Sequence, residues 1–343
     1  MTAARLVARC VRGIEEIVVE EVLGVGEVQA IGHREVRFTA RPDPAVQGLA
    51  TADDVFVLAT ETGGIGRVRA DLERLRRAVA ATDLDRVLDV RERCGGPPGA
   101  RTLDVSASVL GRRAFNRYDL EDVVGEALAR RLGLPYCTRR AGARPPEGGS
   151  SWRVTVVDDR ATVALRIPAR PLHRRPYKTA SVPGTLHPPL AAAMLRVAGV
   201  GAGHTLLDPC CGGGTLPIEA AGVAARVFGS DADPVAVAAS VENGRGAGVS
   251  WSVADAGALP LRDGAVDRVV VNPPWARQVG PRGQLAADPD RLWREARRVL
   301  APGGRIVALL PAPRPPAGLV AERALPVSLF GTHPVVTVLT PRP

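Results

Sequence analysis

Short apolar runs alternate with amphipathic stretches in the second half of the chain. The apolar runs predict strands at 205–207, 227–230, 249–253, 267–271 and 305–310. The amphipathic stretches predict helices at 190–198, 216–225, 234–244 and 288–300. Two β-runs close the chain, at 324–330 and 334–340. This alternation is typical of an α/β protein with a doubly wound, Rossmann-like sheet, and we expect a β-hairpin at its end.

The first half reads as two smaller α+β groups. Residues 5–60 predict the order strand, helix, two strands, helix, strand, with a helix near 43–52. The second group predicts two helices at 66–93, an alternating strand at 102–110, a helix at 119–132 and a hairpin at 152–167. In the 119–132 helix, Asp119 is the expected N-cap and Gly133 the expected stop. We therefore expect domains at 1–62, 63–168 and 190–343, with a proline-punctuated linker at 169–189.

Positive charge is concentrated in the middle third of the chain. The 343 residues carry a net charge of +9, and residues 61–180 hold 24 basic and 15 acidic side chains, an excess of the same size. A basic excess confined to one domain is typical of nucleic-acid-binding proteins. The alternative is an ordinary solvated arginine surface.

The five cysteines are scattered and form no C-x-x-C pair, which argues against a disulfide framework and a zinc site. Neither an apolar leader nor a membrane-length apolar run is evident. We therefore expect a cytoplasmic, monomeric protein that binds neither a metal ion nor a membrane.

The stretch 206–215, L-L-D-P-C-C-G-G-G-T, joins a predicted strand to a predicted helix. Its three glycines permit a tight turn and close backbone approach to a ligand, and Thr215 can cap the helix. The dinucleotide-binding motif G-x-G-x-x-G is absent, because Pro217 stands where its third glycine belongs. The phosphate-binding loop G-x-x-x-x-G-K-[ST] is absent too, because the only lysine of the chain is Lys178. Asp208, the acid that opens the turn, suits a ligand with a cationic amino-acid end, such as S-adenosylmethionine. The expected cofactor contacts of the turn are Asp208, Pro209, Cys210, Gly212, Gly214 and Thr215.

Further acids follow the next two strands, where ligands bind in open α/β sheets. Asp231 closes the second strand, and its carboxylate can accept from both ribose hydroxyls. Asp233 fits better as the N-cap of the helix opened by Pro234. Asp255, followed by Ala256, comes after the third strand and can accept from the adenine amino group.

The sequence N-P-P-W at 272–275 directly follows the fourth strand. An exocyclic amine is a poor nucleophile because its lone pair is delocalised into the ring. The Asn272 side-chain oxygen and the Pro273 carbonyl can accept its two N–H bonds, which leaves the lone pair aimed at a sulfonium methyl. The prolines donate no competing N–H, and Trp275 offers a stacking face. Catalysis would then be positioning and charge placement. The alternative is a proline-rich turn with a surface tryptophan.

This motif resembles the (N/D)-P-P-(Y/F/W) motif of amino-methyltransferases. We therefore expect catalysis from Asn272, Pro273, Pro274 and Trp275, with Asn272 also near the cofactor. Trp275 departs from the Tyr or Phe usual in RNA-modifying members. Stacking survives that change, in a pocket that must hold a larger ring.

The resemblance covers nearly the whole chain. The segments D-V-S-A-S at 104–108, F-N-R-Y at 115–118 and P-L-H-R-R-P-Y-K at 171–178 resemble those of THUMP-containing class I RNA methyltransferases. In that family a ferredoxin-like unit and a THUMP domain precede the methyltransferase fold. The resemblance implies S-adenosylmethionine as cofactor and methylation of guanine N2 in structured RNA, commonly tRNA, with the THUMP unit gripping the acceptor end.

Two basic groups are the expected RNA contacts. The first lies between a strand and a helix and combines cations, an aromatic ring and a helix N-terminus: Arg112, Arg113, Asn116, Arg117 and Tyr118. The second lies in the linker: His173, Arg174, Arg175 and Lys178. Any one of them can equally be a solvated cation, and it is their clustering that favours RNA.

Several alternatives keep part of this interpretation. The substrate can be ribosomal RNA, and DNA adenine or protein glutamine also presents a planar amino group to such a loop. The resemblance of the middle third to a THUMP domain argues against the last two. A non-enzymatic alternative is an RNA-binding protein whose methyltransferase fold has lost activity, against which the intact acids and Asn272 argue.

Overall fold

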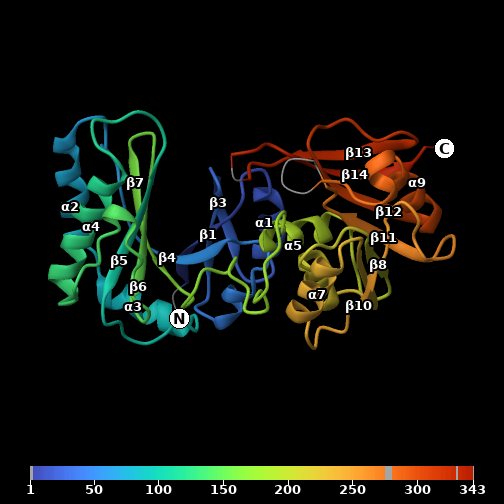
Figure 1. Cartoon of the computed structure of the whole chain (residues 1–343). Helices are drawn as coiled ribbons and strands as arrows, with labels where there is room; N and C mark the ends of the chain where they lie inside the picture. The colour runs from blue at the N-terminus through green and yellow to red at the C-terminus, as the bar shows by residue number, and fades with distance from the viewer. Residues whose placement is uncertain (1–2, 275–279, 330, 343) are drawn as a thin grey trace. The chain divides into compact units, whose positions relative to one another are not determined.

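The structure is a computed structural model that describes residues 3–274, 280–329 and 331–342 (Figure 1). The chain folds into two compact units, neither of them continuous in sequence. The N-terminal unit consists of the residues up to Arg9, Val19–Leu49 and Asp53–Leu172. The C-terminal unit consists of Cys10–Val18, Ala50–Ala52 and the residues from His173 onward. Trp275 lies outside the described residues.

The N-terminal unit is built on one seven-stranded sheet, in the order β2-β3-β1-β4-β7-β6-β5. Its strands are β1 Ala4–Arg9, β2 Glu27–Gly32, β3 Glu35–Ala40, β4 Asp54–Thr62, β5 Leu103–Val109, β6 Ser150–Val157 and β7 Arg160–Arg166. Neighbouring strands are antiparallel except β5 and β6. Because β4 pairs with both β1 and β7, the two predicted α+β groups share one hydrogen-bonded sheet. A boundary at residue 62 remains a prediction.

Helices of the N-terminal unit pack on one face of this sheet. They are α2 Leu72–Ala80, α3 Leu84–Arg93 and α4 Arg117–Leu132, while α1 Glu15–Val22 lies at the point where the chain passes between the units. Figure 1 shows α2 and α4 on the same side of β5 and β6. Strand positions alternate between the two faces, so Trp152, Val154 and Val156 of β6 are buried together.

Two local predictions in the N-terminal unit need correction. The helix expected near 43–52 is a short 3₁₀ turn, Pro44–Gly48, capped by Asp43. The α4 helix begins earlier than expected, because Asn116 is its N-cap. The Asn116 side chain accepts hydrogen bonds from the backbone of Tyr118 and Asp119, and Asp119 accepts one from the Asn116 N–H. This reciprocal capping box leaves Asp119 inside the first turn. Gly133 ends the helix in the left-handed region, as predicted.

The C-terminal unit contains the doubly wound sheet that the sequence predicts. Its strands are β8 Thr205–Asp208, β9 Arg226–Asp231, β10 Ser250–Val253, β11 Val266–Val271, β12 Leu300–Leu310, β13 Leu319–Pro326 and β14 Val335–Pro341. The order is β10-β9-β8-β11-β12-β14-β13, with the first five parallel and β14 antiparallel to both neighbours. The closing hairpin is therefore present, and its second strand inserts between β12 and β13.

Helices of the C-terminal unit are α5 Pro188–Val197, α6 Thr215–Ala221, α7 Pro234–Asn243, α8 Gln284–Ala287 and α9 Arg291–Val299. One side chain layer, including Leu207, Val269, Trp293 and Ile306, forms the core between the sheet and α9. Among the helices of the described residues, none combines the length and the apolar character needed to cross a membrane.

Candidate active site

A cavity of about 480 Å³ opens at the carboxyl ends of β8, β9 and β11 in the C-terminal unit. Its lining gathers the turn after β8, the end of β9, the segment after β11 and part of the linker. Of the residues predicted for the cofactor or catalysis, it includes Asp208, Pro209, Cys210, Gly212, Thr215, Asp231, Ala256, Asn272, Pro273 and Pro274. Segments far apart in sequence thus meet at one sheet edge, as expected for parallel strands.

The glycine turn differs in detail from its prediction. Gly214, in the left-handed region, is the N-cap of α6, and Thr215 is the first residue of the helix rather than its cap. A side chain at Gly214 would come within 2.8 Å of Trp251, so this glycine serves helix packing, whereas Gly212 lines the cavity. The Thr215 hydroxyl is buried and has no hydrogen-bond partner in the described part of the chain. A ligand in the cavity can supply that partner.

Two carboxylates stand together at the strand ends. Asp231 accepts hydrogen bonds from the Gly212 N–H and the Asp233 N–H, both at 2.9 Å, and so fixes the turn. Asp208 is buried and accepts from the Cys210 N–H at 3.0 Å. Burial raises the pKa of Asp208, and the negative charge of Asp231 raises it further. Such a pair favours a ligand that brings positive charge.

The two neighbouring thiols are not activated. Burial raises the pKa of Cys210 and of Cys211, and the charges of Asp208 and Asp231 add to the effect. Both side chains therefore stay protonated and act as packing groups of the turn.

Asp233 is among the residues that line the cavity, whereas Asp255 is not. Asp233 caps α7 by accepting from the Val235 N–H at 3.0 Å, as predicted, and also pairs with Arg282 at 3.0 Å. Both carboxylate oxygens of Asp255 are occupied, one by the Gly257 N–H at 2.8 Å and one by the Gln284 N–H at 2.7 Å. In the described lining it is Ala256, not Asp255, that faces the cavity. Asp255 instead anchors the start of α8, a short helix that the sequence pattern does not predict.

Asn272 lies immediately after β11, at the cavity. Its side-chain N–H donates to the Gly184 carbonyl at 3.3 Å. This bond engages the donor end of the amide and directs the acceptor oxygen away from Gly184. The partner comes from the linker, whose segment 182–186 forms one wall of the cavity. Sequence reasoning missed that wall; the only local signal was the Pro-Gly turn at 183–184.

The linker itself is fastened to the C-terminal unit by the basic residues predicted to contact RNA. Arg175 pairs with Glu219 of α6 at 2.9 Å and donates to the Ala50 carbonyl at 2.6 Å. Lys178 is half-buried and donates to the Leu186 carbonyl at 3.4 Å. His173 lies against the His187 ring, while Arg174 is exposed. Of the four, Arg174 keeps the surface position that RNA contact requires.

In the loop at 112–118 of the N-terminal unit, too, some predicted RNA contacts are bonded within the chain and others are exposed. Arg113 donates to the carbonyls of Gly66, Leu110 and Asp158, so it ties loops together. Asn116 caps α4. Arg112 and Arg117 are exposed, and the Arg117 guanidinium lies 4.6 Å from the centre of the Tyr118 ring.

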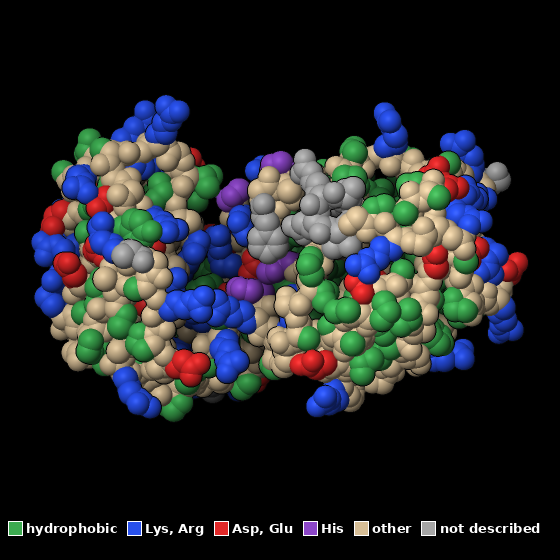
Figure 2. All heavy atoms as spheres, viewed as in Figure 1, with side chains coloured by type: hydrophobic (Ala, Val, Ile, Leu, Met, Phe, Trp, Pro, Cys, Tyr) green, Lys and Arg blue, Asp and Glu red, His purple; other side chains and the backbone are tan. Residues whose placement is uncertain are grey.

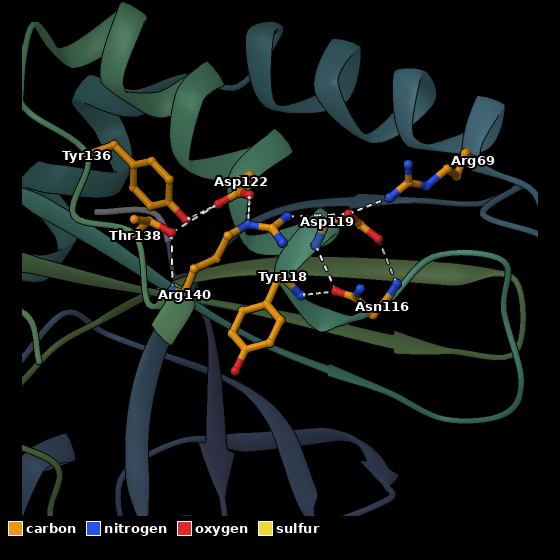
Figure 3. A network of polar contacts seen from close by, with 8 residues as sticks. All are labelled: Arg69, Asn116, Tyr118, Asp119, Asp122, Tyr136, Thr138 and Arg140. Atoms are coloured by element: carbon orange, nitrogen blue, oxygen red, sulfur yellow. Dashed lines mark hydrogen bonds and ion pairs between the residues drawn. The ribbon is translucent and has the colours of Figure 1, made fainter. Parts of the chain in front are cut away.

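Figure 3 shows a polar network beside Tyr118, whose backbone N–H donates to the Asn116 side chain at 2.8 Å. Asp119 accepts from Arg69 at 2.6 Å, and Asp122 accepts from Tyr136 at 3.0 Å. Arg140 pairs with both acids and lies 5.5 Å from the centre of the Tyr118 ring. Two guanidinium groups therefore lie near the ring, and together with it they combine phosphate-binding cations with an aromatic side chain.

Residues 175–328 match the RMKL-like methyltransferase domain family. Over 253 residues the chain is 34% identical to the tRNA (guanine(6)-N2)-methyltransferase of Thermus thermophilus, covering 70% of this chain and 73% of that protein. The chain belongs to the guanine-N2 RNA methyltransferase family. A second relative, the tRNA (guanine(10)-N2)-dimethyltransferase of Methanothermobacter thermautotrophicus, is 36% identical over 45% of this chain and 46% of its own length.

Solved structures agree with this family. The crystal structure of TrmN from Thermus thermophilus superposes with a TM-score of 0.77 at 28% identity, covering 98% of this chain and 99% of that one. The resemblance seen in the sequence and the α/β fold are thus confirmed. The protein is a methyltransferase that uses S-adenosylmethionine.

Proposed function

We propose that this enzyme transfers a methyl group from S-adenosylmethionine to the exocyclic N2 of a guanosine in tRNA. The observation that carries the proposal is the position of Asn272, whose amide is oriented by Gly184 in a cavity that also holds Asp208 and Asp231. The activities in the names of the two relatives support tRNA as the substrate class. We propose further that it acts as a cytoplasmic monomer without a metal ion.

The cavity residues fit the cofactor that the family uses. Asp208 suits the cationic amino-acid end, Asp231 the ribose hydroxyls, and Ala256 a contact with the adenine ring. The unpartnered Thr215 hydroxyl gives the site one more polar group for a ligand. When bound, the cofactor supplies an electrophilic methyl on a sulfonium.

The catalytic residues then act by holding the amine. The Asn272 oxygen and the Pro273 carbonyl accept its two N–H bonds, which directs the nitrogen lone pair at the methyl. Proline at 273 and 274 keeps this loop stiff and free of competing N–H donors. Rate enhancement comes from position and charge placement rather than from a covalent intermediate. Stacking of the base on Trp275 remains a prediction.

RNA contact in this proposal falls to the exposed Arg112, Arg117 and Arg174 and to the partly exposed Tyr118. Phosphate contacts position the RNA, and an aromatic ring can stack on an unpaired base. Arg113, Asn116, Arg175 and Lys178 support these surfaces through hydrogen bonds and an ion pair to other parts of the chain.

The test is methyl transfer from labelled cofactor to total tRNA, ribosomal RNA, DNA and protein in separate reactions, followed by nucleoside analysis. We expect N2-methylguanosine in tRNA. Asn272→Ala should lower kcat by about 100-fold or more while RNA and cofactor affinity change little. Label in ribosomal RNA, DNA or protein would show that the substrate is that molecule rather than tRNA. No label anywhere, with the cofactor still bound, would favour an inactive RNA-binding protein.

A further inference from the structure

The sheet of the N-terminal unit has a second face, opposite the helices, and arginines gather on it. Alternation along the strands places Arg9 of β1, Arg153 of β6 and Arg166 of β7 on this face. Register puts Arg153 beside Ala164 of β7 and Ser106 of β5. Arginine side chains are prominent on the surface of this unit, in the left part of Figure 2.

The arginines around Arg153 each have a carboxylate partner. Arg9 pairs with Glu35 at 2.9 Å, Arg139 with Asp104 at 2.6 Å, Arg166 with Asp54 at 2.6 Å and Arg34 with Asp53 at 3.7 Å. These pairs balance their own charges. They contribute guanidinium groups to the surroundings of Arg153 without leaving a carboxylate for it.

Arg153 is the exception. Its Nε is buried and has no hydrogen-bond partner among the described residues. Burial, and after it the positive charges of Arg9, Arg34, Arg166 and Arg139, lower the pKa of Arg153 to about 10. A guanidinium at that pKa is still charged at neutral pH. The sheet face therefore holds one buried cation in excess.

An uncompensated buried charge is costly, since burial removes hydration and the neighbouring cations repel it. Such a group persists where a ligand of opposite charge compensates it, and an unsatisfied buried donor points to a missing partner. The guanidinium fork matches the oxygens of a phosphate, which can accept from several arginines at once.

We propose that Arg153, with the arginines around it, binds one phosphate group of the RNA substrate on the face of the N-terminal sheet that lies opposite the helices. The ligand is a phosphate, either a backbone phosphodiester or the terminal monophosphate. None of its residues belongs to the loop at 112–118 or to the linker group. It deepens the proposed function and rests on it for the identity of the RNA, while the binding of a phosphate stands on the residues of the sheet.

The first measurement is the melting temperature of the full chain in phosphate and in chloride at matched ionic strength. We expect phosphate to raise the Tm of the wild type and to leave the Tm of Arg153→Met unchanged. In chloride the variant should melt at the same temperature or higher, because it loses an unpaired buried charge. Arg153→Lys should keep part of the response. Arg86→Met, at an exposed position on α3, is the matched control and should respond to phosphate like the wild type.

The second measurement is the affinity for total tRNA against salt concentration. Arg153→Met should weaken binding about 10-fold and reduce the slope of log K against log salt by about one. Removal of the 5′ phosphate from the tRNA separates the two sources. If it weakens the wild type but not the variant, the ligand is the terminal monophosphate; if it weakens neither, the ligand is a backbone phosphate.

A lower Tm for Arg153→Met with an unchanged phosphate response and unchanged RNA affinity would overturn the proposal, and Arg153 would be a structural residue only. These readouts need no methyl transfer. If no RNA accepts a methyl group while Arg153→Met still loses phosphate and RNA binding, the proposed function fails and the phosphate site stands.

Discussion

The guanidinium of Arg175 lies 2.9 Å from the carboxylate of Glu219, and the Tyr177 hydroxyl donates to the same carboxylate at 2.7 Å. Glu219 belongs to α6, the helix that begins at the glycine turn. The basic linker is thereby fixed to the element that forms the cofactor cavity. The charge of Arg175, which suggested RNA contact, is used inside the C-terminal unit.

Glu219→Ala should lower the free energy of unfolding by about 3 kcal/mol, because it leaves a largely buried Arg175 without its carboxylate. Glu219→Gln should cost less, since the amide oxygen can still accept one bond. Urea denaturation measures both. Arg174→Met, at an exposed linker position, is the control and should be neutral. Equal stability of Glu219→Ala and wild type would show that the pair does not hold the linker.

Asn116→Ala should destabilise the N-terminal unit by about 1 kcal/mol, because the first-turn N–H groups of α4 lose their cap. Asn116→Asp should restore most of that stability. Comparing the tRNA affinity of the two variants separates the cap from direct RNA contact. Affinity that is lost in both, despite restored stability in Asn116→Asp, would place Asn116 at the RNA.

Asp231→Asn should raise the cofactor Kd by about 10- to 100-fold. The amide has one acceptor in place of two, so either the Gly212 or the Asp233 N–H loses its partner and the ribose loses a charged acceptor. Calorimetry with S-adenosylmethionine measures the change. Asp233→Asn keeps an oxygen to cap α7 and should stay within about threefold of wild type. Equal effects at the two positions would contradict a special role for Asp231.

Burial raises the pKa of Asp54 to about 6, from 3.8 in an unstructured chain, against the opposing charge of Arg166. The folded protein therefore binds this proton more tightly than the unfolded chain does. The contribution of Asp54 to stability is present below about pH 4 and falls as the pH rises through 6, by about 3 kcal/mol at most. The difference in unfolding free energy between Asp54→Asn and wild type should grow over that window. A difference independent of pH would contradict the raised pKa.

Local patterns were sufficient where one segment determines the structure. The strand before Asp208, the turn at Gly212 and the stop at Gly133 all follow from neighbouring residues. The sequence pattern starts α4 later than the structure does, because Asn116 and Asp119 are both good caps and only their reciprocal bonds decide between them.

What the sequence does not reveal is which distant groups meet. Asp255 has the position of an adenine acceptor, yet its second oxygen is taken by Gln284, 29 residues further on. The Gly184 carbonyl that orients Asn272 is 88 residues away in the chain. The sequence shows Arg153 only as an ordinary strand arginine. In the folded sheet the positive charges of four other arginines act on it. Pairing across such separations is fixed by topology and cannot be read from one segment.

The chain changes unit at five points, after Arg9, Val18, Leu49, Ala52 and Leu172. No single truncation therefore yields either unit intact. A fragment that ends at the linker loses the surroundings of Ile14 and Ile17, and a fragment that starts there lacks the backbone carbonyl of Ala50 that receives Arg175. Exchanging the N-terminal unit between relatives therefore requires several coordinated junctions, and a single crossover joins residues of one relative to a unit of the other.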